Sequence, residues 1–367
     1  MNESFPKIKN ERTVTSIVMF VIFWSFRVCS LLTLVSLVKS SSVGSDIRIM
    51  GNKMSSSSSN DDVVTLKDES GASAKIYLYG ATITSFVTAS KKEILFVSEK
   101  AIVDGSKAIR GGIPLVFPIF GPPTDESSDM PQHGFARNNR WTLITNNNNE
   151  AILELNYKNH VMNGIGTKGF WSLKEDGSHD VTLRLTVRIQ AEFISTTLDI
   201  TNTSNNNTPL ENLQALFHTY YQIDNHAALN PDACAVLSGS DGYSIIDKVN
   251  GSSPSSSSCH PPNTPITVTG EVDRIYNPPT DKKSLHVILQ TGTNSKIDLK
   301  AEASIVGSPL PVSVVVWNPH IEKAKNMGDF GDEQYHDMLC VEPGILNDVP
   351  LLQPNQTLHF TQTISTL

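Results

Sequence analysis

Alternation of apolar and polar residues is the main pattern of the chain from Val63 onward. The clearest example is Val181–Ile189, where apolar side chains occupy the odd positions and polar ones the even positions. A strand with one buried face has this period of two, so the segment is predicted to be a half-buried β-strand. Similar short runs predict further strands at Ala74–Tyr79, Glu93–Val97, Ala151–Tyr157, Leu198–Thr201, Leu285–Gln290, Lys296–Leu299, Val312–Trp317 and Thr357–Ile364.

Helical periodicity is almost absent, and only Asp332–Leu339 favours a turn or two of helix. Clusters of Asn, Ser, Gly and Pro separate the predicted strands, as turn-forming residues do. Many short strands without an alternating strand–helix rhythm predict an all-β fold with antiparallel sheets in a single domain. A large sandwich or a barrel would satisfy this pattern.

The first 62 residues have a different composition. Ile17–Val38 is a nearly apolar run, interrupted by Arg27, that is long enough to cross a bilayer as a signal anchor or long signal peptide. Met54, in contrast, opens a Ser-rich acidic segment of the kind that begins many soluble proteins. We therefore predict a hydrophobic leader and a Ser-rich disordered tail over residues 1–62, and one folded domain over residues 63–367.

Composition narrows the class of protein further. The net charge of −8 offers no basic surface for nucleic acid. The four cysteines, Cys29, Cys234, Cys259 and Cys340, lack the spacing of a zinc site. Three of them lie outside the tail, an odd number that does not suggest a disulfide framework, so we expect a reducing compartment. The predicted location is cytoplasmic, with a membrane-anchored or secretory protein as the alternative if the leader is real; membrane contact would then be made through the leader alone.

Two neighbouring segments, Ile109–Gly121 and Pro131–Arg137, combine turn-forming and apolar residues. The first holds three glycines and two prolines within thirteen residues, so its backbone is expected to take unusual turns and to approach a ligand closely. Its Leu, Val, Ile and Phe side chains indicate a packed loop rather than a surface loop. Four polar side chains on these loops favour a polar or anionic ligand: Arg110, Gln132, His133 and Arg137.

Three further residues have side chains that could take part in chemistry. His218 lies in an aromatic strand, and taken alone it reads as a core histidine with its hydrogen bonds satisfied. Asp273, taken alone, reads as a turn residue. Glu342 follows four apolar residues, Met338–Val341, and precedes a turn. A carboxylate at the end of a buried strand is costly unless it is paired or used, so Glu342 is the strongest single candidate.

Taken together, these segments resemble the aldose 1-epimerase (mutarotase-like) family. The similarity is closest to its hexose-6-phosphate branch, the glucose-6-phosphate 1-epimerases, and extends from Val63 to the C-terminus. Six separated motifs carry it in the family's order: RGGIPLVFPIFG, PQHGFAR, LFHTYY, EVDRIY, VVVWNPHIEKAKNMGDF and CVEPG. The resemblance implies a galactose mutarotase-like β-supersandwich with its site on one concave face. It also implies no metal and no organic cofactor, and we expect a monomer whose partner is a small sugar phosphate.

Residue by residue, the resemblance implies that His218 is the general acid and Glu342 the general base. The remaining candidates would contact the ligand: Arg110, Gln132, Arg137, Asp273 and, on a sugar hydroxyl, His133. The two arginines would lie nearest the phosphate.

The expected reaction explains these residue types. Interconversion of anomers requires a proton on the ring oxygen and the loss of one from the C1 hydroxyl, which we expect an imidazolium and a carboxylate on opposite sides to perform. Desolvation would raise the pKa of Glu342 and make it a stronger base. Arginines bind a phosphate dianion through planar paired donors, and the N–H groups of Gly111 and Gly112 would also approach the anion.

Three alternatives remain open at the level of sequence. The first is a sandwich that binds a sugar without turnover. The second is a mutarotase for free aldoses such as galactose or glucose, against which only the arginines speak. The third is a glycoside hydrolase that uses Asp273 and Glu342 as its carboxylate pair.

Overall fold

A computed structural model describes residues 62–123, 130–157, 180–205, 207–224, 234–251, 258–347 and 349–367. All of them belong to the second of the two units into which the chain divides, Ser56–Leu367. The apolar run Ile17–Val38 lies outside the described residues, so the leader and the boundary at residue 62 stay predictions. Along the described ranges, no helix is long and apolar enough to span a bilayer.

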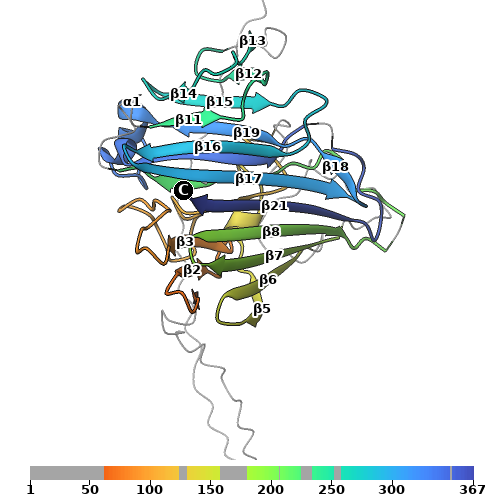
Figure 1. Cartoon of the computed structure of the whole chain (residues 1–367). Helices are drawn as coiled ribbons and strands as arrows, with labels where there is room; N and C mark the ends of the chain where they lie inside the picture. Colours follow the sequence, from red (N-terminus) through yellow and green to blue (C-terminus); the bar gives the residue numbers. More distant parts are fainter. Residues whose placement is uncertain are drawn as a thin grey trace, which may run out of the picture. The chain divides into compact units, whose positions relative to one another are not determined.

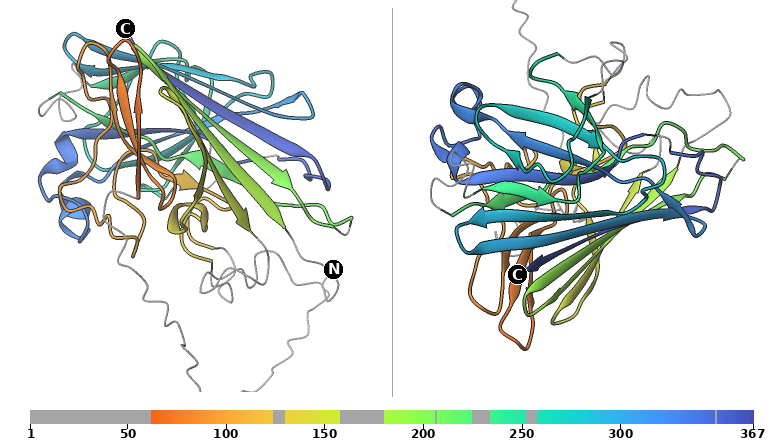
Figure 2. Two further views of the ribbon diagram at one scale, coloured as in Figure 1. Left: turned by 90° about the horizontal axis from the view of Figure 1, so that it is seen from below. Right: turned by 45° about the horizontal axis from the view of Figure 1, so that its top comes forward.

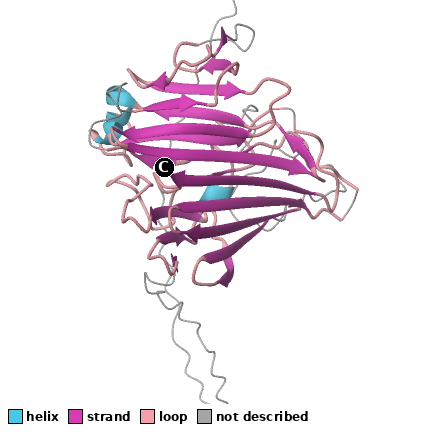
Figure 3. Ribbon diagram, in the orientation of Figure 1, coloured by secondary structure: helices cyan, strands magenta, loops and turns pink. Residues whose placement is uncertain are grey.

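Antiparallel strands are the main secondary structure of the described chain and form three sheets (Figures 1 and 3). The smallest sheet has three strands, β1 (Val63–Lys67), β2 (Ser73–Tyr77) and β3 (Thr82–Val87). The largest has ten in the described residues; its order is β14 (Ile266–Thr267), β11 (Ala235–Ser238), β16 (Leu285–Gly292), β17 (Ser295–Ile305), β21 (Thr357–Thr366), β8 (Phe193–Asn202), β7 (Val181–Gln190), β6 (Glu150–Tyr157) and β5 (Thr142–Asn146), with β18 (Ser308–Leu310) on β17.

The third sheet carries the residues of chemical interest. Its eight described strands follow the order β13 (Ser258–Cys259), β12 (Ser244–Asp247), β15 (Val272–Asn277), β19 (Ser313–Asn318), β20 (Met338–Ile345), β9 (Ala215–Phe217) and β4 (Leu115–Val116), with β10 (Tyr220–Gln222) also on β20. Neighbours in this sheet are often far apart in sequence, so segments from the whole chain meet on it.

The main core lies between the two large sheets, which form two layers in the views of Figure 2. Strand β7 contributes its odd positions, such as Leu183 and Leu185, while its even positions face away and are partly or fully exposed. Strand β20 contributes Leu339 and Val341 to the same core. The prediction of an all-β antiparallel sandwich is therefore confirmed.

Most predicted strands are present and extend a few residues further, because their partners continue the pairing. Glu93–Val97 is an exception, since it forms isolated bridges to three separate segments instead of one continuous strand. Within Asp332–Leu339 a 3₁₀ turn forms at Gln334–His336, and β20 already begins at Met338. The helix α1 (His320–Lys325) was not predicted, because a single buried residue, Ala324, leaves no apolar stripe to recognise.

Candidate active site

Strand β20 holds Glu342 in an unusual position for a carboxylate. All eight residues of the strand are buried, and the Glu342 side chain is only 1% exposed. Successive side chains of a strand point to opposite faces, so Glu342 points away from the main core that receives Val341. Cys340 lies on the same face as Glu342 and packs in a second apolar cluster with Tyr220 and Trp317.

His218 lies in a gap between two strands that both pair with β20. Strand β9 pairs with Gly344 and Ile345, whereas β10 pairs with the first residues of β20, and His218 falls between β9 and β10. Its backbone N–H donates to the carbonyl oxygen of Pro114, and its ring stacks on Tyr220 with centroids 4.8 Å apart and planes 10° apart. The interruption of pairing therefore turns His218 toward the middle of β20.

The two side chains meet directly. His218 Nδ1 lies 3.4 Å from Glu342 Oε1, at an angle that does not make a hydrogen bond. Both His218 Nδ1 and Glu342 Oε2 are buried without a hydrogen-bond partner among the described residues. The expected arrangement, with acid and base on opposite sides of the sugar, is thus replaced by a pair in contact. Two polar atoms buried without partners are costly, which is typical of atoms reserved for a ligand.

Burial dominates the protonation of this pair. Desolvation raises the pKa of the Glu342 carboxyl well above its ordinary value, and the nearby Asp273 carboxylate raises it further. Desolvation lowers the pKa of His218 well below its ordinary value, with the positive charges of Arg137 and Arg110 acting in the same direction. Both shifts favour the uncharged pair, a carboxylic acid beside a neutral imidazole. The raised pKa of Glu342 agrees with the prediction from the sequence. The imidazolium form expected for His218, however, is not favoured in the free site.

A cavity of about 660 Å³ opens above this pair. Six of the seven residues proposed from the sequence line it: Arg110, Gln132, His133, His218, Asp273 and Glu342. These residues come from separate loops and strands, so only the folded sheet brings them together.

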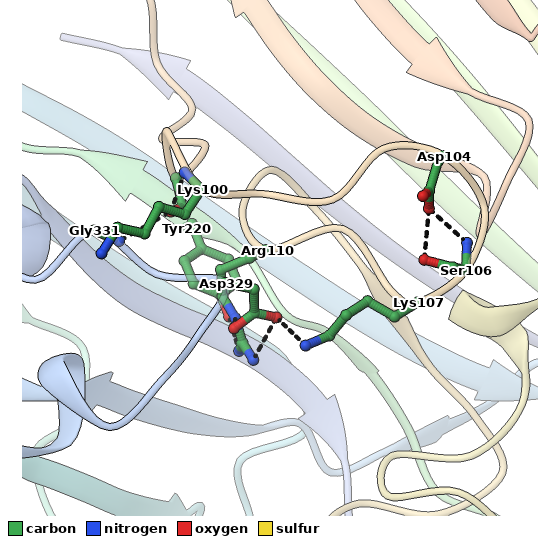
Figure 4. Close-up of polar contacts among 9 residues, drawn as sticks. Lys100, Asp104, Ser106, Lys107, Arg110, Tyr220, Asp329 and Gly331 are labelled. Carbon is green, nitrogen blue, oxygen red and sulfur yellow. Dashed lines mark hydrogen bonds and ion pairs between the residues drawn. The ribbon is translucent and has the colours of Figure 1, made fainter.

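Arg110 is held by a buried carboxylate that sequence reasoning missed. Its Nε and Nη2 donate to the two oxygens of Asp329, each at 3.3 Å, and its Nη1 donates to the Tyr220 hydroxyl at 3.1 Å (Figure 4). Lys107 contacts the same carboxylate at 2.9 Å from the solvent side. Although burial opposes ionisation, Lys107 and Arg110 hold the pKa of Asp329 below its ordinary value. The guanidinium is thereby fixed in orientation next to the ring that stacks on His218.

Arg137 is placed differently from the prediction. It is not among the residues that line the cavity; its Nη2 donates to the backbone carbonyl oxygen of Gln132 at 2.9 Å. Its Nε is buried without a hydrogen-bond partner in the described part of the chain. Burial lowers the pKa of Arg137 to about 10, which leaves it charged at neutral pH. Arg137 is thus held against the backbone of Gln132, and its positive charge acts to lower the pKa of both His218 and Glu342.

His133 is a neutral side chain in this site. Its Nδ1 accepts a hydrogen bond from the Gly121 N–H at 3.1 Å, so the proton of the neutral ring is on Nε2. Burial, together with the charges of Arg137 and Lys248, lowers its pKa to about 2. The ring lies edge-on to His218, with centroids 5.7 Å apart. His133 can thus offer an N–H group to a ligand oxygen.

Two lysines in the cavity were not expected from the sequence. Lys248 follows β12, lies 4.1 Å from the centroid of the Phe120 ring, and has its Nζ 3.6 Å from Asp273. Lys323 projects from α1 and pairs with Glu271 at 2.8 Å. An isolated lysine next to a turn carries no sequence signal, whereas Lys323 lies inside the WNPHIEKAKNMGDF motif and could have been proposed from it.

Gly111 and Gly112, whose N–H groups were expected to approach an anion, have a packing role, and the expectation fails for Gly112. The N–H of Gly112 donates to the carbonyl oxygen of Phe96 and is not available to an anion. Gly112 has φ +68°, and a Cβ there would collide with the carbonyl oxygen of Ile83. A Cβ on Gly111 would collide with Val97. These glycines allow close packing of three backbone segments beneath the cavity.

The fold and this buried pair define a sugar-converting sandwich, and comparison with known proteins gives the family. The sequence model described as aldose 1-epimerase matches residues 62–365, and the chain belongs to this family. It is therefore a carbohydrate epimerase, an isomerase with a small-molecule carbohydrate substrate.

The relatives it resembles carry a more specific name. A protein of Cenchrus ciliaris called "Putative glucose-6-phosphate 1-epimerase" is 30% identical over 304 residues, which cover 80% of this chain and 81% of the relative. A protein of the same name from Escherichia coli strain K12 is 29% identical and covers 81% and 88% of the two chains. Among solved structures, a "putative mutarotase (YeaD)" from Salmonella typhimurium superposes with a TM-score of 0.62 at 23% identity, covering 83% of this chain and 91% of that one. The structural similarity confirms the mutarotase-like fold.

Proposed function

We propose that the protein is a hexose-6-phosphate 1-epimerase, with glucose 6-phosphate as the leading substrate. The observation that carries this proposal is a cavity whose lining combines a buried, uncharged His218–Glu342 pair with the cationic side chains of Arg110, Lys248 and Lys323. The names of the relatives support the same substrate. Each of these cations pairs with a carboxylate in the free protein, and a phosphate could compete with those carboxylates for them, whereas a free aldose carries no charge to do so.

The contact between the catalytic pair suits the chemistry of an anomeric carbon. The ring oxygen and the C1 hydroxyl oxygen are both bonded to C1, so a proton donor and acceptor that touch each other can reach both. In the opening step, Glu342 accepts the proton of the C1 hydroxyl and His218 donates a proton to the ring oxygen. After rotation about C1–C2, Glu342 returns its proton to the aldehyde oxygen while His218 takes one back, and the ring closes on the other face.

Burial sets the starting point of this cycle. The uncharged pair, with the proton on Glu342, is the state that the opening step produces, so the free site matches the open-chain sugar. A ring-form sugar needs the proton on His218 instead. The two groups are 3.4 Å apart without a hydrogen bond, so the transfer requires a small rotation of the side chains that aligns them. Asp273 raises the pKa of Glu342 and opposes this transfer, whereas the charge of Lys248 lowers that pKa and favours it. Asp273 is then better placed to accept from sugar hydroxyls than to act as a second catalytic carboxylate.

The phosphate is assigned to the cationic part of the cavity. Arg110 presents a fixed guanidinium, and Lys248 can leave its 3.6 Å contact with Asp273 to neutralise a dianion. Arg137, behind Gln132, adds long-range attraction rather than a direct contact. His133 and Gln132 remain candidates for hydroxyl contacts. A sugar phosphate is an intracellular substrate, so we propose a cytoplasmic monomer in which residues 1–53 are dispensable.

The test is anomer exchange of glucose 6-phosphate followed by NMR, with a buffer blank because sugar phosphates mutarotate unaided. Protein starting at Met54 should exchange the anomers well above the blank, and Glu342→Gln should lose this excess while keeping affinity for the ligand. Exchange of free glucose or galactose in preference to the phosphate would replace the proposal with a free-aldose mutarotase. Binding without any exchange would leave a sugar-binding sandwich.

A further inference from the structure

Cys340 is a buried thiol that the proposed proton transfer does not use. It precedes Glu342 by two residues on β20, so both side chains lie on the same face of the strand. It is paired in register with Trp317 on one side and Tyr220 on the other, and is 0% exposed. It is thus fixed directly beside the catalytic pair, beneath the floor of the cavity.

The three side chains bring three different donor atoms together. One ligand atom each from His218, Cys340 and Glu342 can be chosen so that all three lie within 4.8 Å of one another. His218 Nδ1 and Glu342 Oε2 have no hydrogen-bond partner in the described residues, and the side chains of both residues are more than nine-tenths buried. His218 and Glu342 also line the cavity, so an ion could reach the group from that side.

An imidazole nitrogen, a thiolate and a carboxylate oxygen form a donor set that suits zinc and related thiophilic ions rather than Mg²⁺ or Ca²⁺. In a tetrahedral site, sulfur and nitrogen bound to one zinc lie about 3.6 Å apart. The 3.4 Å between His218 Nδ1 and Glu342 Oε1 already suits such a site, and with all three atoms within 4.8 Å the sulfur needs to approach by about 1 Å. Three protein ligands and a fourth position open to the cavity would complete a tetrahedral site.

We propose that His218, Cys340 and Glu342 form an inhibitory binding site for a thiophilic divalent cation, with Zn²⁺ as the first candidate. When the ion binds, the Cys340 thiol and the Glu342 carboxyl each lose a proton to solvent, and the sulfur–metal and oxygen–metal bonds form with no oxidation. The ion occupies the two groups that transfer protons, so it excludes turnover, and sugar and metal compete. Metal binding stands on geometry alone; the inhibition rests on the proposed epimerase function.

Binding is tested on the full-length, reduced chain by titration with Co²⁺ and Zn²⁺. Co²⁺ should give an absorption band of thiolate-to-metal charge transfer at one equivalent, and Zn²⁺ should displace it. Cys340→Ala and Cys340→Ser should each lose this band and weaken Zn²⁺ binding about 100-fold, because one of three ligands is gone. Cys234→Ala is the matched control, since Cys234 is equally buried but lies beside β11 in the other large sheet. Circular dichroism and thermal unfolding establish that each variant is folded.

Inhibition is measured separately, as the anomer-exchange rate at rising Zn²⁺ divided by the metal-free rate of the same variant. Wild type and Cys234→Ala should be inhibited, with relief by EDTA and by excess glucose 6-phosphate, whereas the Cys340 variants should need about 100-fold more Zn²⁺. A Co²⁺ spectrum without a thiolate band, or Zn²⁺ affinity that survives both Cys340 substitutions, overturns the site. Metal binding with the thiolate band but no exchange in metal-free protein leaves the site standing and refutes the epimerase function instead. Binding with full activity retained refutes the inhibitory role.

Discussion

Strands β7 and β20 are both antiparallel and similar in length, but the faces that they turn away from the core differ in their exposure to solvent. In β7, buried positions alternate with partly or fully exposed ones, and the outward side chains Arg184 and Arg188 pair with Glu154 and Glu150 near solvent. In β20 every position is buried, because a second apolar cluster covers Met338 and Cys340 on the face that points away from the core, and Glu342 beside them lines the cavity. The same backbone geometry therefore gives a solvated outward face in β7 and a desolvated outward face, which carries Glu342, in β20.

The difference shows how burial changes the effect of an ionisable side chain. Exposed ion pairs such as those on β7 are screened by water and contribute little. A carboxyl on β20 cannot be screened, so its protonation depends on its few neighbours. Substitutions on the two strands should accordingly have very different consequences.

The largest effect is expected for Glu342→Gln on β20. The amide keeps the shape of the side chain but cannot accept the C1 hydroxyl proton, so kcat/KM for anomer exchange should fall about 10²–10⁴-fold. The matched variant on the solvated side, Glu154→Gln, removes a carboxylate that pairs with Arg184 and should leave exchange unchanged. NMR exchange rates measured for both variants decide the matter. Equal activities would mean that the buried carboxyl is structural.

The second effect concerns the positive charge of Arg110, which lines the cavity above β20. Arg110→Ala should raise KM for glucose 6-phosphate about 10- to 100-fold, the cost of losing a charge-assisted contact, and should hardly change the constants for free glucose. Lys107→Ala is the control, because Lys107 contacts the same Asp329 from the solvent side without lining the cavity. Equal changes for phosphorylated and free sugars would argue that Arg110 serves the fold and not the phosphate.

The third effect is on the pH dependence of stability. Burial raises the pKa of Glu342 in the folded protein, so above its ordinary value of 4.5 the folded state keeps a proton that the unfolded chain has released. The contribution of this group to stability therefore falls as the pH rises through that window. Glu342→Gln cannot titrate, and its stability relative to wild type should increase with pH by at most about 1.4 kcal/mol per unit. Urea unfolding between about pH 5 and 8 measures this, and parallel curves would contradict the raised pKa.

The smallest effect is expected on the outward face of β7. Arg188→Ala removes an exposed ion pair with Glu150 and should cost less than about 1 kcal/mol of unfolding free energy, with no change in anomer exchange. Thermal or urea unfolding at low and high salt provides the measurement. A loss as large as that of a core substitution would mean that the two outward faces are not as different as described.

Local pattern was sufficient to predict β7, because its alternation repeats over the whole strand. It was also sufficient to single out Glu342, since a carboxyl next to apolar residues is costly wherever the strand lies. The contact of Glu342 with His218 could not be predicted, because it depends on how β9 and β10 share one partner strand. The grouping of His218 and Glu342 with Cys340 could not be predicted either. The spacing rules for metal ligands apply to residues close in sequence, and His218 comes from a separate segment of the chain.

The charged residues of the cavity also differ in how far the sequence could predict them. Arg110 was proposed from its loop, but its partner Asp329 lies over two hundred residues later, and only the fold brings the two together. Arg137 was proposed as a direct phosphate contact, although sequence cannot tell a side chain in the wall from one behind it. Lys248 has no local signal at all.

The position of β20 within its sheet has a consequence for hydrogen exchange. The strand bonds to β19 along one edge and to β9 and β10 along the other, and even in the gap the Val341 N–H donates to the Thr219 carbonyl oxygen at 3.3 Å. Its amides should then exchange with deuterium only when the whole domain opens. Glu342, the proposed general base, should thus lie in the last part of the protein to unfold, and on heating, anomer exchange and native structure should disappear together.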